Sequence, residues 1–322
     1  MDDATRERLT VPRRDALMAS AGLTPGHYRE IGGFENILYA GERDVIRFTH
    51  RSHRDAAALR GEFEFVSYLA DNDCRVCRPL PLQGGNLMVK DDEFMLARFE
   101  LAPGRAVAEE DWNASLFRRW GESIGRFHRL AANFRPVEKR MHWDEDPNHD
   151  FDTRIPVRHE RIRELAQGLL ADLHLMDRHP SDYGLIHGDA HAGNFFVHDG
   201  MPTFFDFDDT INTWYVYDIA TLVFSVALHP STPPGRAAAS RVVREFLGEF
   251  LEGYSREATY TDFMRREMSR FVKLRELSLF AVIHAFMDVD NIEGEFPRRF
   301  MEGRVESLER GLPFVDVDYA MA

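Results

Sequence analysis

Hydrophobic and polar residues alternate in short runs near the start of the chain. Residues 27–50 contain three apolar runs, which are separated by Gly32-Gly33 and by the polar turn at residues 41–44. Short alternating runs between turn residues are typical of strands, and glycine marks the points where the backbone changes direction. This pattern predicts an antiparallel meander of three strands.

The pattern then becomes helical before it returns to strands. Over residues 59–69 the apolar positions recur at helical spacing, so we expect one helix that crosses behind the sheet. Residues 75–100 contain three more strand candidates and end at the break Ala102-Pro103-Gly104. We therefore predict an N-terminal lobe over residues 1–100, with a hinge at about residues 96–104.

The rest of the chain, residues 105–322, is predicted to form a larger lobe. An apolar stripe at helical spacing covers residues 116–130, whereas residues 136–156 are polar, contain three prolines and have no sustained period. Long loops of this kind often line functional sites. Further helices are predicted over residues 219–227, 237–253, 262–289 and 298–310. The predicted fold class is α+β, with a small antiparallel sheet lobe that contains one helix and a larger, mainly helical lobe.

A stretch of ionisable residues interrupts the helical lobe. Residues 185–210 read LIHGDAHAGNFFVHDGMPTFFDFDDT, in which two apolar runs flank Asp199-Gly200, a strong hairpin signal. Folding this hairpin returns the residues that follow the second strand towards those that precede the first. The polar residues brought together in this way are His187, Asp189 and Asn194 on one side and Asp206 on the other.

These residue types suit the transfer of a phosphoryl group. Asn194 and Asp206 offer hard oxygen ligands for Mg²⁺, whose coordination is completed by water and by substrate phosphates. Asp189, with an ordinary pKa of about 3.9, is ionised at neutral pH and can accept a hydrogen bond from a substrate hydroxyl. Turn-forming Asx residues around a hairpin are the alternative reading. The combined spacing favours phosphoryl transfer, which requires mainly positioning and charge neutralisation.

Composition and charge narrow the class of partner. Of the 322 residues, 44% are hydrophobic and 29% are charged, which is typical of a folded globular protein. The net charge of −14 disfavours nucleic acid as a general partner, because binding phosphates requires a basic surface. No apolar run approaches the roughly 18 residues that would span a membrane, and the first residues lack the apolar segment of a secretory signal, so a cytoplasmic location is expected.

The two cysteines form the motif Cys74-x-x-Cys77. A structural zinc site needs about four ligands, and no second pair of cysteines or histidines is nearby to complete one. A redox-active pair is typically found at the start of a helix, whereas alternation here indicates a short strand. We therefore expect a packing role for both thiols.

Several of these motifs resemble one enzyme family. The spacing His187-x-Asp189-x₄-Asn194, followed by Asp206-Phe207-Asp208, resembles the catalytic and metal loops of the protein-kinase-like fold. The sequence HGDAHAGN is similar in particular to the aminoglycoside phosphotransferase and choline kinase family. Residues 214–220 resemble the segment in which this family places an aspartate, here Asp218, that braces the catalytic loop.

The resemblance implies ATP and Mg²⁺ as cofactors, with Mg²⁺ held by Asn194 and Asp206. It also implies that Asp189 orients the nucleophile and that His187 supports the metal loop. On the strand where the family has a phosphate-binding lysine, this chain has Arg47, whose expected partner is Glu62. Arginine keeps the positive charge but is bulkier and planar, so the phosphate geometry is expected to differ.

The nucleotide-binding lobe of the family has two further features with counterparts here. The loop IGGFENILY resembles the turn that covers the phosphates, with Gly32, Gly33 and Asn36 allowing a close approach of the backbone. The segment FMLARFELAPG resembles the hinge that pairs with adenine, for which Arg98 and Glu100 are the candidates.

Other polar residues have weaker predictions. His191 and His198 have no assigned chemistry; for His191 the two readings are a contact with the active site and a solvated or hydrogen-bonded loop residue. Asp208 and Asp209 either extend the metal site or, as we expect, cap or support the loop. Residues 50–54 form a basic cluster that either contacts nucleotide phosphates or, as we expect, forms a solvated connection. Four carboxylates lie close together near residue 290: Asp288, Asp290, Glu293 and Glu295. They either form an ammonium site in the acceptor pocket or belong to a solvated helix end.

The sequence therefore predicts an ATP- and Mg²⁺-dependent phosphotransferase that acts on a hydroxyl of a small molecule. A cationic amino alcohol or an aminoglycoside-like compound is the candidate acceptor. The alternatives are a protein serine/threonine kinase of the stress-response type, a catalytically silent nucleotide-binding module, and a metal-dependent phosphoesterase. The identity of the acceptor, the choice between ATP and GTP and the oligomeric state are left open.

Overall fold

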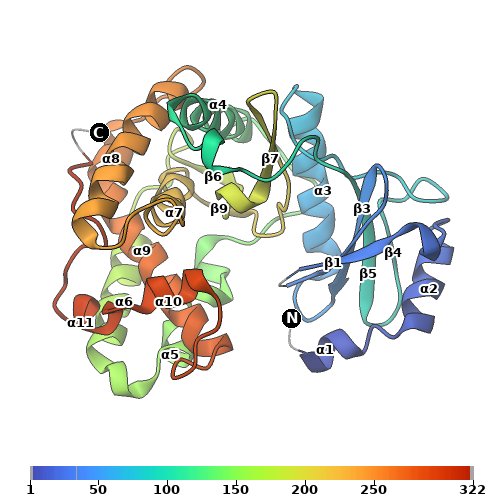
Figure 1. Cartoon of the computed structure of the whole chain (residues 1–322), viewed down its shortest axis with the longest axis horizontal. Coiled ribbons are helices and arrows are strands. Elements are labelled where there is room, and N and C mark those ends of the chain that lie inside the picture. The colour runs from blue at the N-terminus through green and yellow to red at the C-terminus, as the bar shows by residue number, and fades with distance from the viewer. Residues whose placement is uncertain (1–2, 34, 320–322) are drawn as a thin grey trace.

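A five-stranded antiparallel sheet forms the N-terminal part of the molecule (Figure 1). The computed structural model describes residues 3–33 and 35–319. The strand order is β1-β2-β3-β5-β4, with β1 (Arg29–Gly32), β2 (Ile37–Ala40), β3 (Asp44–His50), β4 (Met88–Lys90) and β5 (Phe94–Glu100). The meander predicted over residues 27–50 is confirmed by β1, β2 and β3, which pair in sequence.

Successive side chains of β3 face opposite sides of the sheet. Ile46 and Phe48 are fully buried on the side that α2 (Val11–Ser20) covers. Arg47, between them, points to the other side, where it meets α3 (Ala56–Asp71). α3 is the helix predicted behind the sheet. The sequence did not lead us to predict α2, nor the short helix α1 that precedes it, so the sheet is covered by helices on both faces.

The short helix α1 (Asp3–Glu7) opens the described part of the chain. The segment between α3 and β4 is extended but is not the strand predicted within residues 75–85. It makes only isolated bridges, which join Val76 to Phe204 and Pro79 to Phe99. Proline lacks the N–H that a strand ladder requires, so Pro79 and Pro81 prevent regular pairing.

The C-terminal part is mainly helical and contains the predicted helices together with two that were not predicted. The helices are α4 (Ala114–Ala131), α5 (Phe151–Arg154), α6 (Glu160–His174), α7 (Val216–Ala227), α8 (Arg236–Tyr254), α9 (Asp262–Phe286), α10 (Glu295–Met301) and α11 (Arg304–Glu309). The unpredicted helices are the single turn α5, in the segment predicted to be a loop, and α6. The buried residues of α6 recur at helical spacing: Ile162, Ala166, Leu169 and Leu173. This helical spacing is present in the sequence, so α6 could have been predicted from it.

Two predicted helices have different ends in the structure. α9 stops at Phe286, because Asp288 accepts a hydrogen bond from the N–H of Asp290 at 3.1 Å and so forms a turn that competes with the helix. The single helix predicted over residues 298–310 is divided at Gly303, whose φ of 61° is left-handed. α10 and α11 therefore replace one longer helix.

Glycine allows α4 and α8 to pack in close contact. A Cβ at Gly121 of α4 would collide with the carbonyl of Phe250, and one at Gly253 of α8 would collide with the carbonyl of Arg118. The backbones of the two helices therefore touch, which only residues without a side chain permit. This contact fixes α4, whose apolar stripe over residues 116–130 is buried as predicted.

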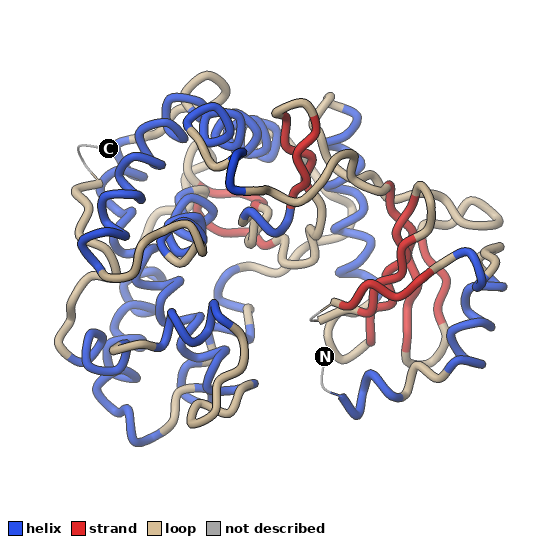
Figure 2. Tube along the Cα trace, viewed as in Figure 1, coloured by secondary structure: helices blue, strands red, loops and turns tan. Residues whose placement is uncertain are grey.

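Two short strand pairs lie between the sheet and the helices (Figure 2). β6 (Tyr183–Ile186) pairs with β9 (Ile211–Trp214), and β7 (Phe195–His198) pairs with β8 (Met201–Phe204). The turn between β7 and β8 has positive φ at both Asp199 and Gly200, as a tight hairpin requires. The predicted hairpin is therefore confirmed.

α3 connects the two parts of the molecule. Its buried residues Phe65 and Leu69 belong to the large helical core, whereas Leu59 and Phe63 pack on the sheet. The boundary near residue 100 stays a prediction. Among the described residues, no helix combines the length and the apolar character that crossing a membrane requires.

Candidate active site

The loop that follows β6 is held by α7. Asp218 accepts hydrogen bonds from the backbone N–H groups of His187 at 3.2 Å and Gly188 at 2.8 Å. Gly188 has a φ of 86°, and a Cβ there would collide with the carbonyl of Asp209, so glycine is required. His128 of α4, which the sequence did not single out, lies 3.1 Å from the Asp218 carboxylate. Asp218 thus makes the bracing contacts that the family resemblance implied.

His187 is completely buried, and both of its ring nitrogens are engaged. Nδ1 accepts a hydrogen bond from the Asp189 N–H at 3.3 Å, so Nε2 carries the proton that it donates to the Phe205 carbonyl at 3.2 Å. Burial lowers the pKa of His187, which favours the neutral ring. These contacts support a role in holding the loop rather than in moving protons.

The carboxylate of Asp189 faces positive groups on both oxygens. Oδ1 accepts a hydrogen bond from Nη2 of Arg275 at 2.6 Å, and Oδ2 lies 3.2 Å from Nε2 of His191. Burial acts to raise the pKa of Asp189, but His191 and Arg275 outweigh it and hold that pKa well below its usual range. The carboxylate is therefore ionised and fixed in direction. His191, which had no assigned chemistry, is a partner of the predicted catalytic group.

The hairpin places Asn194 beside the residues that follow β8. Phe195 pairs with Phe204, and the N–H of Phe205 donates to the Asn194 carbonyl at 3.0 Å, one residue before Asp206. The Asn194 amide nitrogen donates to the Asp189 carbonyl at 2.8 Å, which leaves the amide oxygen for another partner. The fold therefore brings the two predicted metal-binding positions together.

The charge around Asp206 fits a divalent cation. Asp206 has a left-handed φ of 61°, and it is exposed between the buried residues Phe204 and Phe207. Partial removal from water, followed by repulsion from the neighbouring Asp208, raises the pKa of Asp206 to about 7. A cation would relieve this repulsion, and oxygen donors from an amide and a carboxylate match the preference of Mg²⁺. The metal assignment of Asn194 and Asp206 stays a prediction that the geometry accommodates.

The basic cluster at residues 50–54 is only partly the solvated connection that we expected, because Arg51 and Ser52 are exposed whereas His53 and Arg54 contact the loop after β8. Nε2 of His53 donates to the Asp208 carboxylate, and Arg54 makes an ion pair with Asp209 at 2.9 Å. His53 and Arg54 are largely buried, with side chains 16% and 11% exposed, because they lie between the sheet and the loop after β8. Asp208 and Asp209 therefore join the two lobes, a role broader than the loop support that was predicted.

The glycine-rich loop has the backbone freedom that its predicted role requires. Gly32 and Gly33 have φ angles of 99° and 119°. The side chain of Asn36 is buried: its oxygen accepts from Thr49 at 2.7 Å, and its nitrogen donates to Asp208 at 3.4 Å. Asn36 thus anchors the end of the loop. Contacts of Gly32, Gly33 and Asn36 with nucleotide phosphates stay a prediction, and Phe34 lies outside the described residues.

Arg47 and Glu62 form the pair that the resemblance implied. Nη1 and Nη2 of Arg47 donate to the two oxygens of Glu62 at 2.8 and 2.6 Å, and the guanidinium lies 4.8 Å from the ring centroid of Phe99. Burial acts to lower the pKa of Arg47, but Glu62 and Asp208 raise it above its ordinary value. The Arg47 charge is therefore permanent and faces the loop after β8.

Two backbone groups of the predicted hinge are already occupied. The Arg98 carbonyl accepts from Leu80 N–H at 2.7 Å, and the Glu100 N–H donates to the Arg78 carbonyl at 2.9 Å. The Arg98 side chain is paired with Asp44. Adenine recognition at Arg98 and Glu100 stays a prediction. Because the Arg98 carbonyl and the Glu100 N–H are occupied, adenine would have to bind other backbone groups of residues 98–102.

Arg140 was missed by sequence reasoning, although it lies in the connection over residues 136–156. It is buried, and its guanidinium donates to the carbonyls of Thr210 at 2.7 Å and Ala58 at 2.8 Å, and also to that of Asp208. It therefore ties α3 to the loop that carries the predicted metal ligand. A single arginine in an irregular segment has no periodic signal that would reveal this role.

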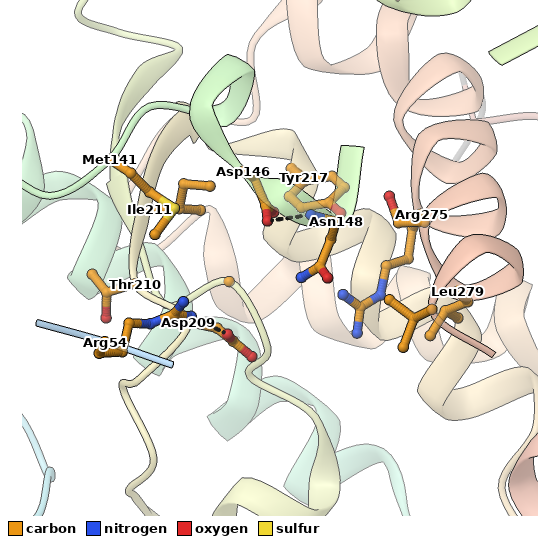
Figure 3. Close-up of a pocket in the computed structure, with 13 residues that line it drawn as sticks. Arg54, Met141, Asp146, Asn148, Asp209, Thr210, Ile211, Tyr217, Arg275 and Leu279 are labelled. Carbon is orange, nitrogen blue, oxygen red and sulfur yellow. Dashed lines mark hydrogen bonds and ion pairs between the residues drawn. The ribbon is translucent and has the colours of Figure 1, made fainter. Parts of the chain in front are cut away.

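A small pocket, with a cavity volume of about 50 Å³, opens beside the catalytic loop (Figure 3). The connection over residues 136–156, predicted to line a site, contributes Met141, Asp146 and Asn148, and contains helical turns rather than irregular chain throughout. Arg275 and Leu279 of α9 form the opposite wall. The pocket is therefore a candidate for binding the acceptor.

The four carboxylates between residues 288 and 295 do not take part in this pocket. Asp288, Asp290, Glu293 and Glu295 are all exposed, and none lines it. The structure thus favours the solvated reading over the ammonium site. His198 is exposed beside Asp199, away from the predicted cluster.

Cys74 and Cys77 are buried free thiols. Burial raises the pKa of Cys74 to about 11 and that of Cys77 to about 12, so both stay protonated at neutral pH. This agrees with a packing role.

Comparison with known proteins identifies the class. Residues 28–268 match the model of the phosphotransferase enzyme family. Amicoumacin kinase of Bacillus subtilis (strain 168) is 30% identical over 94% of this chain and 93% of its own length. The structure of amicoumacin kinase hAmiN in complex with AMP-PNP, Ca²⁺ and Ami superimposes with a TM-score of 0.90 at 26% identity, covering 100% of this chain and 99% of that one. The serine/threonine protein kinase RdoA of Salmonella typhimurium is 26% identical over 64% of each chain.

The fold and the site define a nucleotide-dependent phosphotransferase with a bilobal protein-kinase-like fold. The chain belongs to the phosphotransferase enzyme family. The predicted fold class, the family and the transfer of phosphate from a nucleotide, with a divalent metal, to a hydroxyl of a small molecule are thereby confirmed. The protein-kinase, phosphoesterase and silent-module alternatives are not favoured.

Proposed function

We propose that this kinase transfers the γ-phosphate of Mg²⁺-bound ATP to a hydroxyl of a small molecule that also carries an amine, as in compounds of the amicoumacin class. Similarity to amicoumacin kinases over nearly the whole chain supports this class of acceptor. The observation that carries the proposal is a carboxylate without an ion-pair partner among the described residues, that of Asp146, in the pocket that Gly188 of the catalytic loop also lines.

Asp146 is placed to bind an ammonium group. Among the described residues that line the pocket, Arg54 is paired with Asp209 and Arg275 with Asp189, whereas none of the ion pairs found includes Asp146. Its Oδ1 accepts from the Asn148 N–H at 2.8 Å, which fixes the carboxylate and leaves the other oxygen free (Figure 3). An amine bound there would be held near the catalytic loop.

The residues of the site have separate roles in the transfer. The acceptor hydroxyl oxygen forms a bond to the γ-phosphorus while the bond from phosphorus to the β–γ bridging oxygen breaks, and ADP leaves with that electron pair. Asp189 accepts the hydrogen bond of the hydroxyl and directs its oxygen, and the hydroxyl proton passes to this carboxylate and then to solvent. Asn194 and Asp206 would hold the Mg²⁺ ion, which would supply positive charge to neutralise the phosphates. Arg47 adds positive charge on the sheet side.

The test is acceptor-stimulated release of ADP, measured over a set of hydroxyl compounds with and without an amine. The wild-type protein is expected to respond to amine-bearing acceptors. Asp146→Asn is expected to raise the acceptor KM about tenfold or more with little change in kcat, because a uniform binding contact is lost.

Asp152→Asn is the matched control, since Asp152 lies on α5 of the same connection, is exposed and does not line the pocket. Equal KM values for the two variants would contradict the ammonium assignment. Modification of amine-free acceptors alone would contradict the proposed class of acceptor.

A further inference from the structure

Asp189 receives its shortest side-chain contact from a distant helix. Arg275 lies in the middle of α9, 86 residues further along the chain, and its Nη2 donates to Asp189 Oδ1 at 2.6 Å. The other oxygen of Asp189 faces His191, which carries a charge only when protonated. Arg275 is therefore the permanently charged partner of this carboxylate.

Arg275 is itself held in place by the protein. Its side chain is 21% exposed, at the edge of the pocket. Tyr217 of α7 interacts with the guanidinium, and burial, which would lower the pKa of Arg275, is outweighed by Asp189 and Tyr217. Figure 3 shows the guanidinium pointing from α9 into the same space as the Asn148 amide. The arginine thus lies between a rigid helix and the place where the acceptor has to bind.

This arrangement determines the direction of the Asp189 carboxylate. A carboxylate turns readily about its last side-chain bond, because that torsion is broad. Hydrogen bonds on both oxygens, from Arg275 and from His191, restrict the rotation to one orientation. The Asn194 amide nitrogen also donates to Oδ2 of Asp189, at 3.5 Å. Each oxygen of an ionised carboxylate has about two lone-pair sites, so Oδ2 is filled and one site on Oδ1 remains for the acceptor hydroxyl.

We propose that Arg275 is a positioning residue, which holds the Asp189 carboxylate in the orientation that accepts the hydrogen bond of the attacking hydroxyl. The proposal rests on the proposed function of Asp189 and adds a residue that no motif of the catalytic loop contains. It predicts a loss in the rate of transfer rather than in the binding of nucleotide or acceptor, since misplacement of a reacting group acts on the transition state.

The experiment compares Arg275→Ala, Arg275→Lys and the control Arg266→Ala. Arg266 lies on the same helix and is exposed, and among the described residues it makes an ion pair with Glu267 and a cation–π contact with Phe263. Two activities are measured: transfer to an acceptor, and the slow hydrolysis of Mg²⁺-ATP in the absence of acceptor, in which water takes the place of the hydroxyl. Melting temperature and Mg²⁺-ADP affinity report on folding and on the nucleotide site.

Arg275→Ala is expected to lower both rates about 10²-fold, with acceptor KM and ADP affinity changed by no more than about twofold. Arg275→Lys is expected to retain an intermediate rate, because lysine keeps the charge but not the planar geometry. If the alanine variant does not fold, the lysine variant provides the test instead. Guanidinium ion at millimolar concentration is expected to rescue Arg275→Ala but not Arg275→Lys.

Unchanged hydrolysis in Arg275→Ala, or a higher acceptor KM at unchanged kcat, would overturn the positioning role. Failure of the proposed function has a different signature, in which the wild-type protein hydrolyses ATP but modifies no acceptor. In that case the hydrolysis rates still decide the role of Arg275. A wild-type protein that neither hydrolyses nor transfers would overturn both proposals.

Discussion

The Arg47–Glu62 pair and the Arg275–Asp189 pair each join an arginine to a carboxylate, on opposite sides of the cleft. In the first pair two hydrogen bonds connect the side chains, which are 5% and 1% exposed. In the second a single bond of 2.6 Å does so, and the side chains are 21% and 22% exposed at the edge of the acceptor pocket. The ion pair in the sheet lobe is therefore closed to solvent, whereas the ion pair in the helical lobe is open to it.

The difference indicates what each pair does. A buried bidentate pair fixes two structural elements, here β3 and α3, and leaves little freedom for exchange with a substrate. An open pair keeps lone pairs and N–H groups available to a ligand. We therefore assign the first pair to alignment of the lobe and the second to the reaction.

Breaking the closed pair is expected to have the largest effect on stability. Arg47→Met leaves the Glu62 charge buried without a partner, so the free energy of unfolding should fall by about 3–5 kcal/mol, as measured by urea denaturation. The double variant Arg47→Met/Glu62→Leu should recover much of the loss, because the uncompensated charge is also removed.

The open pair provides the comparison. Arg275→Met should lower the free energy of unfolding by only about 1 kcal/mol, since water replaces part of what the pair contributes. Equal losses for Arg47→Met and Arg275→Met would contradict the distinction between a closed and an open pair.

The dependence of nucleotide binding on pH gives a smaller, more specific effect. The pKa of Asp206 is raised to about 7, and Mg²⁺ requires the ionised carboxylate. Metal-dependent binding of ADP should therefore strengthen by about tenfold as pH rises from about 6 to about 8. By the same linkage, the metal-free protein gains stability from protonated Asp206 at low pH and loses it as pH rises through about 7. Calorimetry measures the affinity for ADP as a function of pH. In the control variant Asp206→Asn this affinity should not change with pH over the same range.

The smallest expected effect is a shift in the pH midpoint of metal-dependent binding, which should differ between variants of Arg47 and Arg275. Arg47 lowers the pKa of Asp206, whereas Arg275 is not among the charges that most affect it. The pH midpoint of metal-dependent binding should consequently rise in Arg47→Met by a few tenths and stay unchanged in Arg275→Met. A shift of the same size in both variants would show that the two charges act on the metal site alike.

The same contrast explains which residues were accessible from the sequence. Arg47 and Glu62 are separated by 15 residues within one strand and the helix that follows, so local periodicity and a family motif located both. Asn194 and Asp206 were located because a hairpin signal between them determines how the chain returns. In these cases local structure decides which residues meet.

Other contacts depend on packing between distant segments. Arg275 reaches Asp189 over 86 residues, Arg140 reaches Asp208 over 68, and His53 reaches Asp208 over 155. Each is a single polar side chain in a segment whose pattern reports only a helix or a loop. The lengths of α9 and α10 were predicted wrongly because turn residues end these helices before the apolar pattern ends. The extended segment with Pro79 was predicted wrongly as a strand because proline lacks the N–H that pairing requires.

The most direct test of the whole account is the rate of acceptor-stimulated ADP release by Asp189→Asn, measured together with its affinity for Mg²⁺-ATP. Asparagine keeps the size of the side chain and removes its charge. Transfer is expected to fall by about 10²–10⁴-fold, while Mg²⁺-ATP binds as in the wild-type protein. Turnover close to that of the wild-type protein would show that Asp189 does not orient the hydroxyl, and would contradict the account.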